Sequence, residues 1–126
     1  MVALMRAIQR MLAVITALFS LLGIKSSTVT VSLYTNPDSG YNWSCSIDNK
    51  DILVLSDSYF EEYSVSSLFD GNGDGKQIFI FRAVGEGTAT VTFKYVNSSG
   101  TVASKYIYVY SVDEDLKITL ESKTSS

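Results

Sequence analysis

The stretch that decides the fold runs from Gln77 to Tyr95 and reads QIFIFRAVGEGTATVTFKY. Its first part, Gln77 to Val84, is apolar on both faces, which is typical of a central β-strand. A Gly-Glu-Gly turn at 85–87 ends that strand. From Thr88 to Tyr95 apolar and polar residues alternate, as they do when one face of a strand covers a core. The stretch therefore predicts two strands separated by a turn.

Outward from this stretch, shorter segments follow the same strand pattern. We expect further strands at Thr28 to Tyr34, Tyr41 to Ile47, Ile52 to Leu55, Lys105 to Val112 and Leu116 to Leu120. Residues 56–69 are less regular, and 122–126 are expected to form a frayed polar tail. Seven to eight short strands, with no β-α-β alternation and no internal repeat, predict an all-β, immunoglobulin-like β-sandwich over residues 27–121.

Residues 1–26 differ from the rest in composition. Arg6 and Arg10 precede a 14-residue apolar run, Met11 to Ile24, which is the pattern of a secretory signal peptide. The run is shorter than the roughly 20 residues of a membrane span, but no small-x-small cleavage site follows it, so an uncleaved signal anchor stays open. The alternative is a helix that belongs to the domain. We expect an exported protein: secreted, periplasmic, or attached to a membrane only through an uncleaved leader.

The overall composition argues against catalysis. The chain contains no histidine, which removes Ser-His-Asp and Cys-His mechanisms and the commonest zinc ligand. Its one cysteine, Cys45, has no internal disulfide partner and shares the inward parity of Trp43, so we expect a buried thiol. The net charge is −3, and no basic cluster follows Lys25, which argues against nucleic-acid binding. We therefore expect a monomeric non-enzyme without a cofactor.

One turn stands out as a candidate binding element. It reads Asn36-Pro37-Asp38-Ser39-Gly40-Tyr41. Pro37 fixes one backbone angle, Gly40 can adopt a positive φ, and the Asn36 side chain can bond the backbone two residues on. The result is a stiff, protruding loop, and stiffness lowers the entropic cost of binding. An ordinary connecting turn is the alternative interpretation.

A second loop is rich in glycine and acidic residues. It contains Asp70, Gly71, Asn72, Gly73, Asp74 and Gly75. The oxygen donors at 70, 72 and 74, followed by glycine, resemble the first half of a calcium-binding loop. However, Phe81 stands where an EF-hand has its bidentate glutamate, and no helices are expected on either side. A weak calcium site and a plain acidic loop both remain open, and no metal is assigned.

The ordered set of motifs resembles one family. After the 36–41 turn and Trp43 come the Gly-rich loop 71–75, the Phe79-Ile80-Phe81-Arg82-Ala83 strand, the glycine turn and the strand that ends at Tyr95. This set, spanning roughly residues 28–112, is similar to the chagasin family of cysteine-protease inhibitors. The family's third loop carries Arg-Pro-Trp just after the aromatic residue that corresponds to Tyr95. This chain instead has Val96-Asn97-Ser98-Ser99-Gly100.

The resemblance implies a function and a site. Members are immunoglobulin-like sandwiches whose loops at one end occlude the active-site cleft of papain-like cysteine proteases without covalent chemistry. By this resemblance, the 36–41 turn would be the central loop, and 71–75 and the loop at 96–103 would flank it. The implied protease-binding residues are those of the turn, those of the second loop from Gly71 to Gly75, and Asn97, Ser98, Ser99 and Gly100.

Two other functions remain open from the sequence. The changed third loop favours a structural or adhesive immunoglobulin-like module of an exported or surface protein, because binding surfaces are usually anchored by aromatic and arginine side chains. A carbohydrate- or calcium-dependent binding module is the other possibility. Tyr106, Tyr108 and Tyr110 share one strand face and would serve it, although packing in the core with hydroxyls reaching water is the expectation.

Overall fold

The computed structural model describes residues 27–63 and 73–126, so the expected leader lies outside the described residues. Seven strands and one short 3-10 helix are present in this part of the chain. They are β1 (Thr28–Thr35), η2 (Pro37–Ser39), β2 (Tyr41–Ile47), β3 (Leu53–Glu62), β4 (Gly75–Ala83), β5 (Gly87–Asn97), β6 (Val102–Val112) and β7 (Ile118–Ser125). No helix within these ranges has the length and apolar character needed to cross a bilayer.

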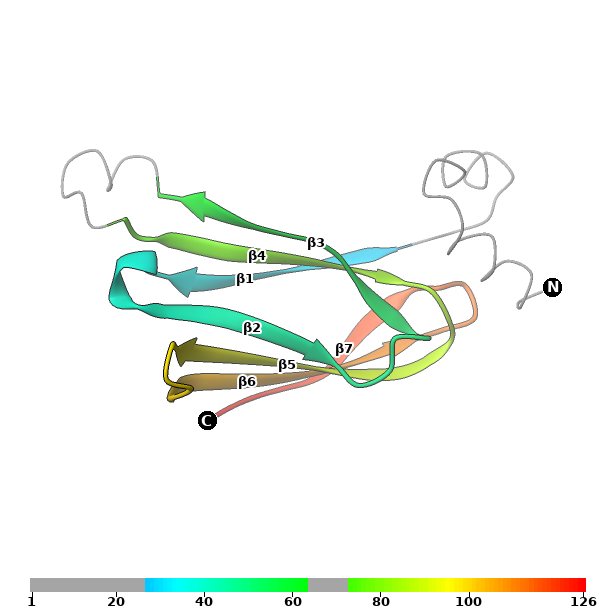
Figure 1. The fold of residues 1–126 in the computed structure, drawn as a ribbon. Helices are drawn as coiled ribbons and strands as arrows, with labels where there is room; N and C mark the ends of the chain where they lie inside the picture. Colours follow the sequence, from blue (N-terminus) through cyan, green and yellow to red (C-terminus); the bar gives the residue numbers. More distant parts are fainter. Residues whose placement is uncertain (1–26, 64–72) are drawn as a thin grey trace.

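The strands form two antiparallel sheets that pack face to face (Figure 1). One sheet has the order β1-β4-β3, and the other has the order β2-β5-β6-β7. A central β4 between β1 and β3, facing a central β5 between β2 and β6, is the strand arrangement of immunoglobulin-like sandwiches. The predicted all-β, immunoglobulin-like fold is therefore confirmed, and β4 is central in its sheet as its two apolar faces indicated.

The core lies where β4 faces β5 and β6. Phe93 packs against Phe79 and Phe81 with ring centroids 5.2 and 5.9 Å apart, and against Tyr108 at 5.2 Å. Phe81 and Phe93 are completely buried. Burying one such side chain contributes about 1.5–3 kcal/mol by transfer from water. These rings hold the two sheets together.

The predicted alternation of β5 and β6 agrees with the burial. Ala89, Val91 and Phe93 are all fully buried, while the residues between them are partly exposed. Tyr108 and Tyr110 lie on the inner face of β6 and are buried, so the tyrosine row packs in the core as expected.

Strand β3 is longer than its sequence pattern indicates. We expected a strand from Ile52 to Leu55, but pairing with β4 continues to Glu62. A register shift between Leu55 and Asp57 inserts Ser56 as an extra residue. After a bulge of this kind, side chains that would have pointed inward point outward, and the reverse. The alternation of apolar and polar residues is therefore interrupted, and the sequence pattern does not show that the strand continues.

Strand β7 also extends beyond its expected end. The polar residues that we assigned to a frayed tail continue β7 to Ser125, which pairs with Tyr106 of β6. The side chains of this segment are exposed. This end of β7 is ordered by main-chain pairing with the long strand β6 and not by burial of apolar side chains. Main-chain pairing leaves no pattern in the side chains, so the sequence did not indicate it.

Replacing the central ring tests the role of the core. We expect Phe93→Ala to lower the free energy of unfolding by about 3–5 kcal/mol, because it deletes a fully buried ring and leaves a cavity. Phe93→Leu, which keeps most of the volume, should cost less than about 1.5 kcal/mol. Urea unfolding followed by circular dichroism measures both. Equal losses for the two variants would contradict the assignment of this ring to the tightly packed core.

Candidate functional site

The 36–41 turn is held by bonds within itself. The backbone N–H of Asp38 donates to Asn36 Oδ1 at 2.9 Å, as the sequence predicted. The Ser39 backbone N–H and hydroxyl both donate to the carbonyl of Asn36, at 3.0 and 2.6 Å. Gly40 ends the 3-10 helix with φ 83°, a left-handed conformation that glycine adopts without strain. Pro37 and Asp38 are left exposed at the tip.

Tyr95, on β5, contacts the turn and helps to hold its shape. Its hydroxyl accepts the backbone N–H of Asn36 at 3.2 Å and lies 3.2 Å from Ser39 Oγ. Its ring stacks on Tyr41, with the centroids 5.4 Å apart. Tyr95 shares the inward parity of Phe93, so its sequence pattern assigns it to the core and gives no signal for this role. The pairing of β2 with β5 brings it under the turn.

Trp43 links the two sheets close to the turn. Its indole N–H donates to the carbonyl oxygen of Tyr34, on β1, at 2.8 Å. The centroid of its ring lies 4.8 Å from that of the Tyr95 ring and 5.5 Å from that of the Tyr106 ring. The expectation that this tryptophan packs inside rather than serving as an exposed platform agrees with its half-buried position against the core.

The second loop is described only in part. Asp70, Gly71 and Asn72 lie outside the described residues, whereas Gly73, Asp74 and Gly75 are described. Gly73 lies against the turn, because a Cβ placed on it would be 3.0 Å from Asp38 Oδ2.

Asp74 joins this loop to β1. The Tyr34 hydroxyl donates to Asp74 Oδ1 at 3.0 Å. This hydrogen bond to a carboxylate raises the pKa of the Tyr34 hydroxyl above its ordinary value. The start of β4 is therefore held beside the end of β1, where the 36–41 turn begins.

The third loop, 97–101, is organised by Asn97. Its side-chain Oδ1 accepts the backbone N–H groups of Ser99 and Thr101 at 3.1 and 2.9 Å. Gly100 N–H donates to the Asn97 carbonyl at 3.0 Å. The Asn97 side-chain amide donates to the Tyr41 hydroxyl at 3.5 Å, a contact that connects this loop to the 36–41 turn.

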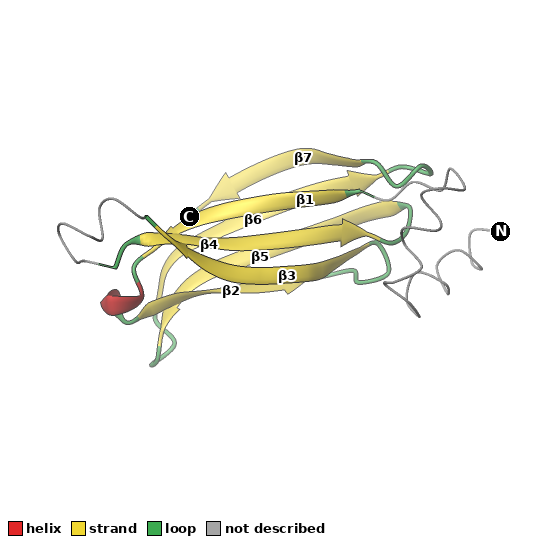
Figure 2. Ribbon diagram, turned by 90° about the horizontal axis from the view of Figure 1, so that it is seen from above, coloured by secondary structure: helices red, strands yellow, loops and turns green. Residues whose placement is uncertain are grey.

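The described parts of the three predicted loops therefore gather at one end of the sandwich. Figure 2 shows η2, the start of β4 and the β5–β6 turn at the end opposite to the β6–β7 connection. Within residues 27–63 and 73–126, no cluster of three or more His, Cys, Asp or Glu side chains could hold a metal ion. Two of the three residues of the possible calcium site fall outside these ranges, so that site stays a prediction.

Comparison with known proteins identifies the family. The family model described as "Chagasin family peptidase inhibitor I42" matches residues 24–113. The chain belongs to the chagasin family. The resemblance inferred from the ordered motifs is thus confirmed.

A solved structure supports the fold of this chagasin-family chain. The cysteine protease inhibitor EhICP2 from Entamoeba histolytica is 22% identical, with a TM-score of 0.51 over 60% of this chain and 68% of that one. None of the curated proteins matches this chain in sequence. At this level of identity, the similarity to EhICP2 shows a shared fold.

Cys45 lies on the inner face of β2 and packs against the core, but it is half-buried, whereas we expected a buried thiol. Both β2 and β3 are at sheet edges, so the space between them is less well covered than the centre. Burial nevertheless raises the pKa of the Cys45 thiol to about 11. At neutral pH the thiol is therefore protonated and a poor nucleophile.

The rate of alkylation of Cys45 tests whether the pKa of its thiol is raised in the folded protein. The pKa rises from 9.0 to about 11, so well below pH 9 the folded protein should hold roughly 100-fold less thiolate than the unfolded chain. We expect alkylation by iodoacetamide at pH 8 to be slower by about that factor in buffer than in urea. The rate should rise with pH until about pH 11. Equal rates in the two solvents would show an unperturbed thiol.

The support that Tyr95 gives to the turn is tested by removing one hydroxyl. Tyr95→Phe keeps the ring stack and deletes the partner of Asn36 and Ser39, which should cost about 0.5–1.5 kcal/mol of stability. We expect faster hydrogen exchange at the amides of residues 36–41. Tyr106→Phe is the matched control, because Tyr106 belongs to the same ring stack without contacting the turn. Unchanged exchange in Tyr95→Phe would show that the turn holds itself.

Proposed function

We propose that the protein inhibits papain-like cysteine proteases by filling the active-site cleft, non-covalently, with the loops at one end of its sandwich. The observation that carries the proposal is the exposed, internally bonded 36–41 turn at the end of a chagasin-family domain. Membership of a peptidase-inhibitor family and a fold shared with a cysteine protease inhibitor support the same class of target. The protein acts as a binder and not as an enzyme.

The turn is suited to act as the central wedge. Its shape is already fixed by bonds to Asn36 and by Tyr95, so little conformational entropy remains to be lost on binding. Asp38 is exposed at its tip, where its carboxylate would meet the catalytic cysteine and histidine of a protease. An imidazolium there would pair with the carboxylate and offset the cost of burying it.

The flanking loops contribute less in this proposal. Binding energy usually comes from a few aromatic and arginine side chains, and the third loop offers Asn97, Ser98 and Ser99 instead. The oxygen atom of the Asn97 side chain is already used within the loop. The turn and Tyr41 therefore carry most of the affinity, with polar contacts at the rim.

The N-terminal segment completes the proposal. An arginine-bearing, apolar leader at residues 1–26 would export the inhibitor, either released or held at a membrane by an uncleaved leader. Export would place the domain where it meets extracellular or compartmentalised proteases.

Titration against papain tests the proposed function. We expect inhibition at micromolar concentration or below, and we expect the double variant Pro37→Ala/Asp38→Ala to raise Ki by about 30-fold or more, the loss typical of a hot spot. Both side chains are exposed, so circular dichroism should be unchanged. Glu114→Ala, in the turn at the opposite end of the sandwich, is the control and should leave Ki unaltered.

The same titration separates the second candidate function. The missing Arg-Pro-Trp of the third loop favours a structural or adhesive module. Under that function, the wild-type protein leaves papain and cathepsin-like enzymes fully active at micromolar concentration, and the double variant behaves like the wild type.

A further inference from the structure

Exposed apolar side chains concentrate along the edge strand β3, whose last residues reach the loop end of the sandwich. Among the residues that the structure describes, seven large hydrophobic side chains are exposed, and four of them lie on β3 or directly after it. They are Leu55 (44% exposed), Tyr59 (44%), Phe60 (40%) and Tyr63 (40%). The other three are Tyr34, Val102 and Leu120, each on a different strand. Leu55 and Phe60 pair with Phe81 and Gln77 on the inner face of β3, whereas Tyr59 pairs with Ile78 on the outer face, so apolar surface is exposed on both faces of this strand.

The same strand is a sheet edge. β3 pairs with β4 on one side, and no other described strand pairs with it. After the bulge at Ser56, the pairing with β4 is regular from Asp57 to Glu62. The groups on the outer side of such a segment form a ready template for an added strand. The bulge protects only the first part of the edge.

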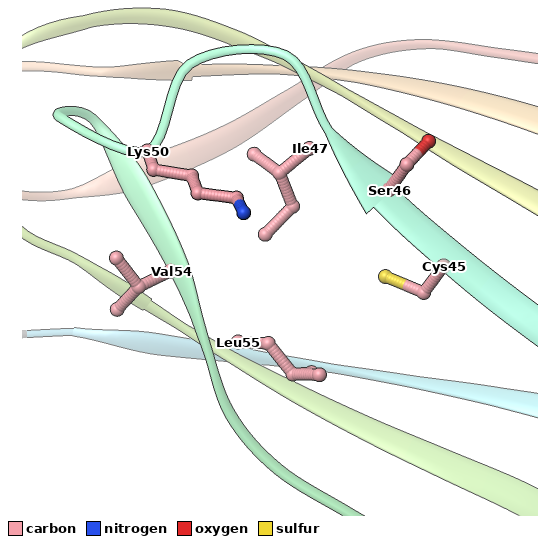
Figure 3. Close-up of a pocket in the computed structure, with 6 residues that line it drawn as sticks. All are labelled: Cys45, Ser46, Ile47, Lys50, Val54 and Leu55. Carbon is pink, nitrogen blue, oxygen red and sulfur yellow. The ribbon is translucent and has the colours of Figure 1, made fainter.

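A hollow lies beside the first part of β3. Figure 3 shows Cys45 and Ile47, from β2, and Leu55, from β3, around the space between the two edge strands. Its volume is about 400 Å³, and Val54 and Lys50 complete one end of it. The hollow is therefore apolar over most of its wall and large enough for one aliphatic or aromatic side chain. In strand addition, such pockets select alternate side chains of the incoming segment.

Charge decides what can pair there. From Leu53 to Tyr63, β3 and its end carry Asp57, Glu61 and Glu62, and no basic residue. Glu61 lies 3.5 Å from Lys76 on the neighbouring β4, which neutralises one of the three. A second copy of this chain, paired antiparallel through β3, would bring like charges together across the new ladder, which is destabilising. A basic segment would instead place opposite charges there.

We propose that β3 is a docking site for an extended, basic segment of another protein, which adds to the sheet as a fourth strand and inserts one apolar side chain into the hollow between β2 and β3. The incoming segment alternates lysine or arginine with apolar residues. The cations lie on the outer face of β3, beside Asp57 and Tyr59, and the apolar residues lie on the inner face, beside Leu55 and Phe60. The hollow is on the flank of the sandwich, whereas the end of β3 lies beside Gly75 of the second loop. The proposal does not depend on the proposed protease inhibition.

A synthetic peptide tests the site directly. The probe is a short peptide in which lysine alternates with valine and leucine, and the control is the same peptide with glutamate in place of lysine. We expect the basic peptide to bind in calorimetry and the acidic one not to bind. Hydrogen exchange should show the slowed amides on β3, between Asp57 and Glu62, and not on the 36–41 turn.

Strand β7 supplies matched controls, because it is also a sheet edge. Asp57→Lys and Leu55→Thr should each weaken peptide binding at least about fivefold, by removing one charge pair or the apolar contact. Glu121→Lys changes the net charge equally, and Leu120→Thr alters a leucine of similar exposure, 47%. Both β7 variants should bind the peptide as the wild type does.

Four outcomes would overturn the proposal. The first is that the basic peptide fails to bind, and the second is that the β7 variants weaken peptide binding as much as the β3 variants do. The third is that the free protein sediments as a dimer with β3 protected, which would make a second copy the occupant. The fourth is that the β3 amides already exchange slowly in the free monomer, which would mean that the chain's own residues cover this edge. Papain inhibition is measured separately, so its absence leaves this site standing.

Discussion

The contact of Phe93 with Phe79 and Phe81 is the interaction on which the rest of the structure depends. These rings meet at the middle of the sandwich, where the central strands β4 and β5 face each other. They set the separation and alignment of the two sheets, because aromatic side chains of this size leave few alternative packings. Once the sheets are aligned, the connections between strands must emerge at fixed positions, and three of them emerge at one end.

A second, smaller aromatic cluster transmits this order to the loop end. Trp43 bonds the backbone of β1 from β2, and Tyr95 bonds the turn between those same strands. One cluster thus fixes the fold and the other fixes the shape of the turn. The cover is less complete on the flank between β2 and β3, where Cys45 and Leu55 are only partly covered. A hollow of about 400 Å³ marks this flank.

The fold was predictable because the strands show apolar and polar side chains in alternation, with a period of two residues. The alternation of β5 and the apolar β4 were sufficient to indicate a sandwich, and the turn residues 36–41 indicated a stiff loop. The length of β3 was hidden because Ser56 changes the parity, and the end of β7 was hidden because main-chain pairing orders it. The role of Tyr95 was not visible, because a strand residue of inward parity looks the same whether it fills the core or holds a loop.

The bent shape of the 36–41 turn makes the turn itself resistant to proteolysis. A protease cuts a peptide bond after drawing the substrate into an extended conformation along its cleft. Residues 37–39 form a 3-10 helix, and Gly40 follows in a left-handed conformation. To become extended, the segment would have to break its bonds to Asn36 and Tyr95 together. A segment so constrained is a poor protease substrate, because its peptide bonds are not held in the extended geometry that cleavage demands.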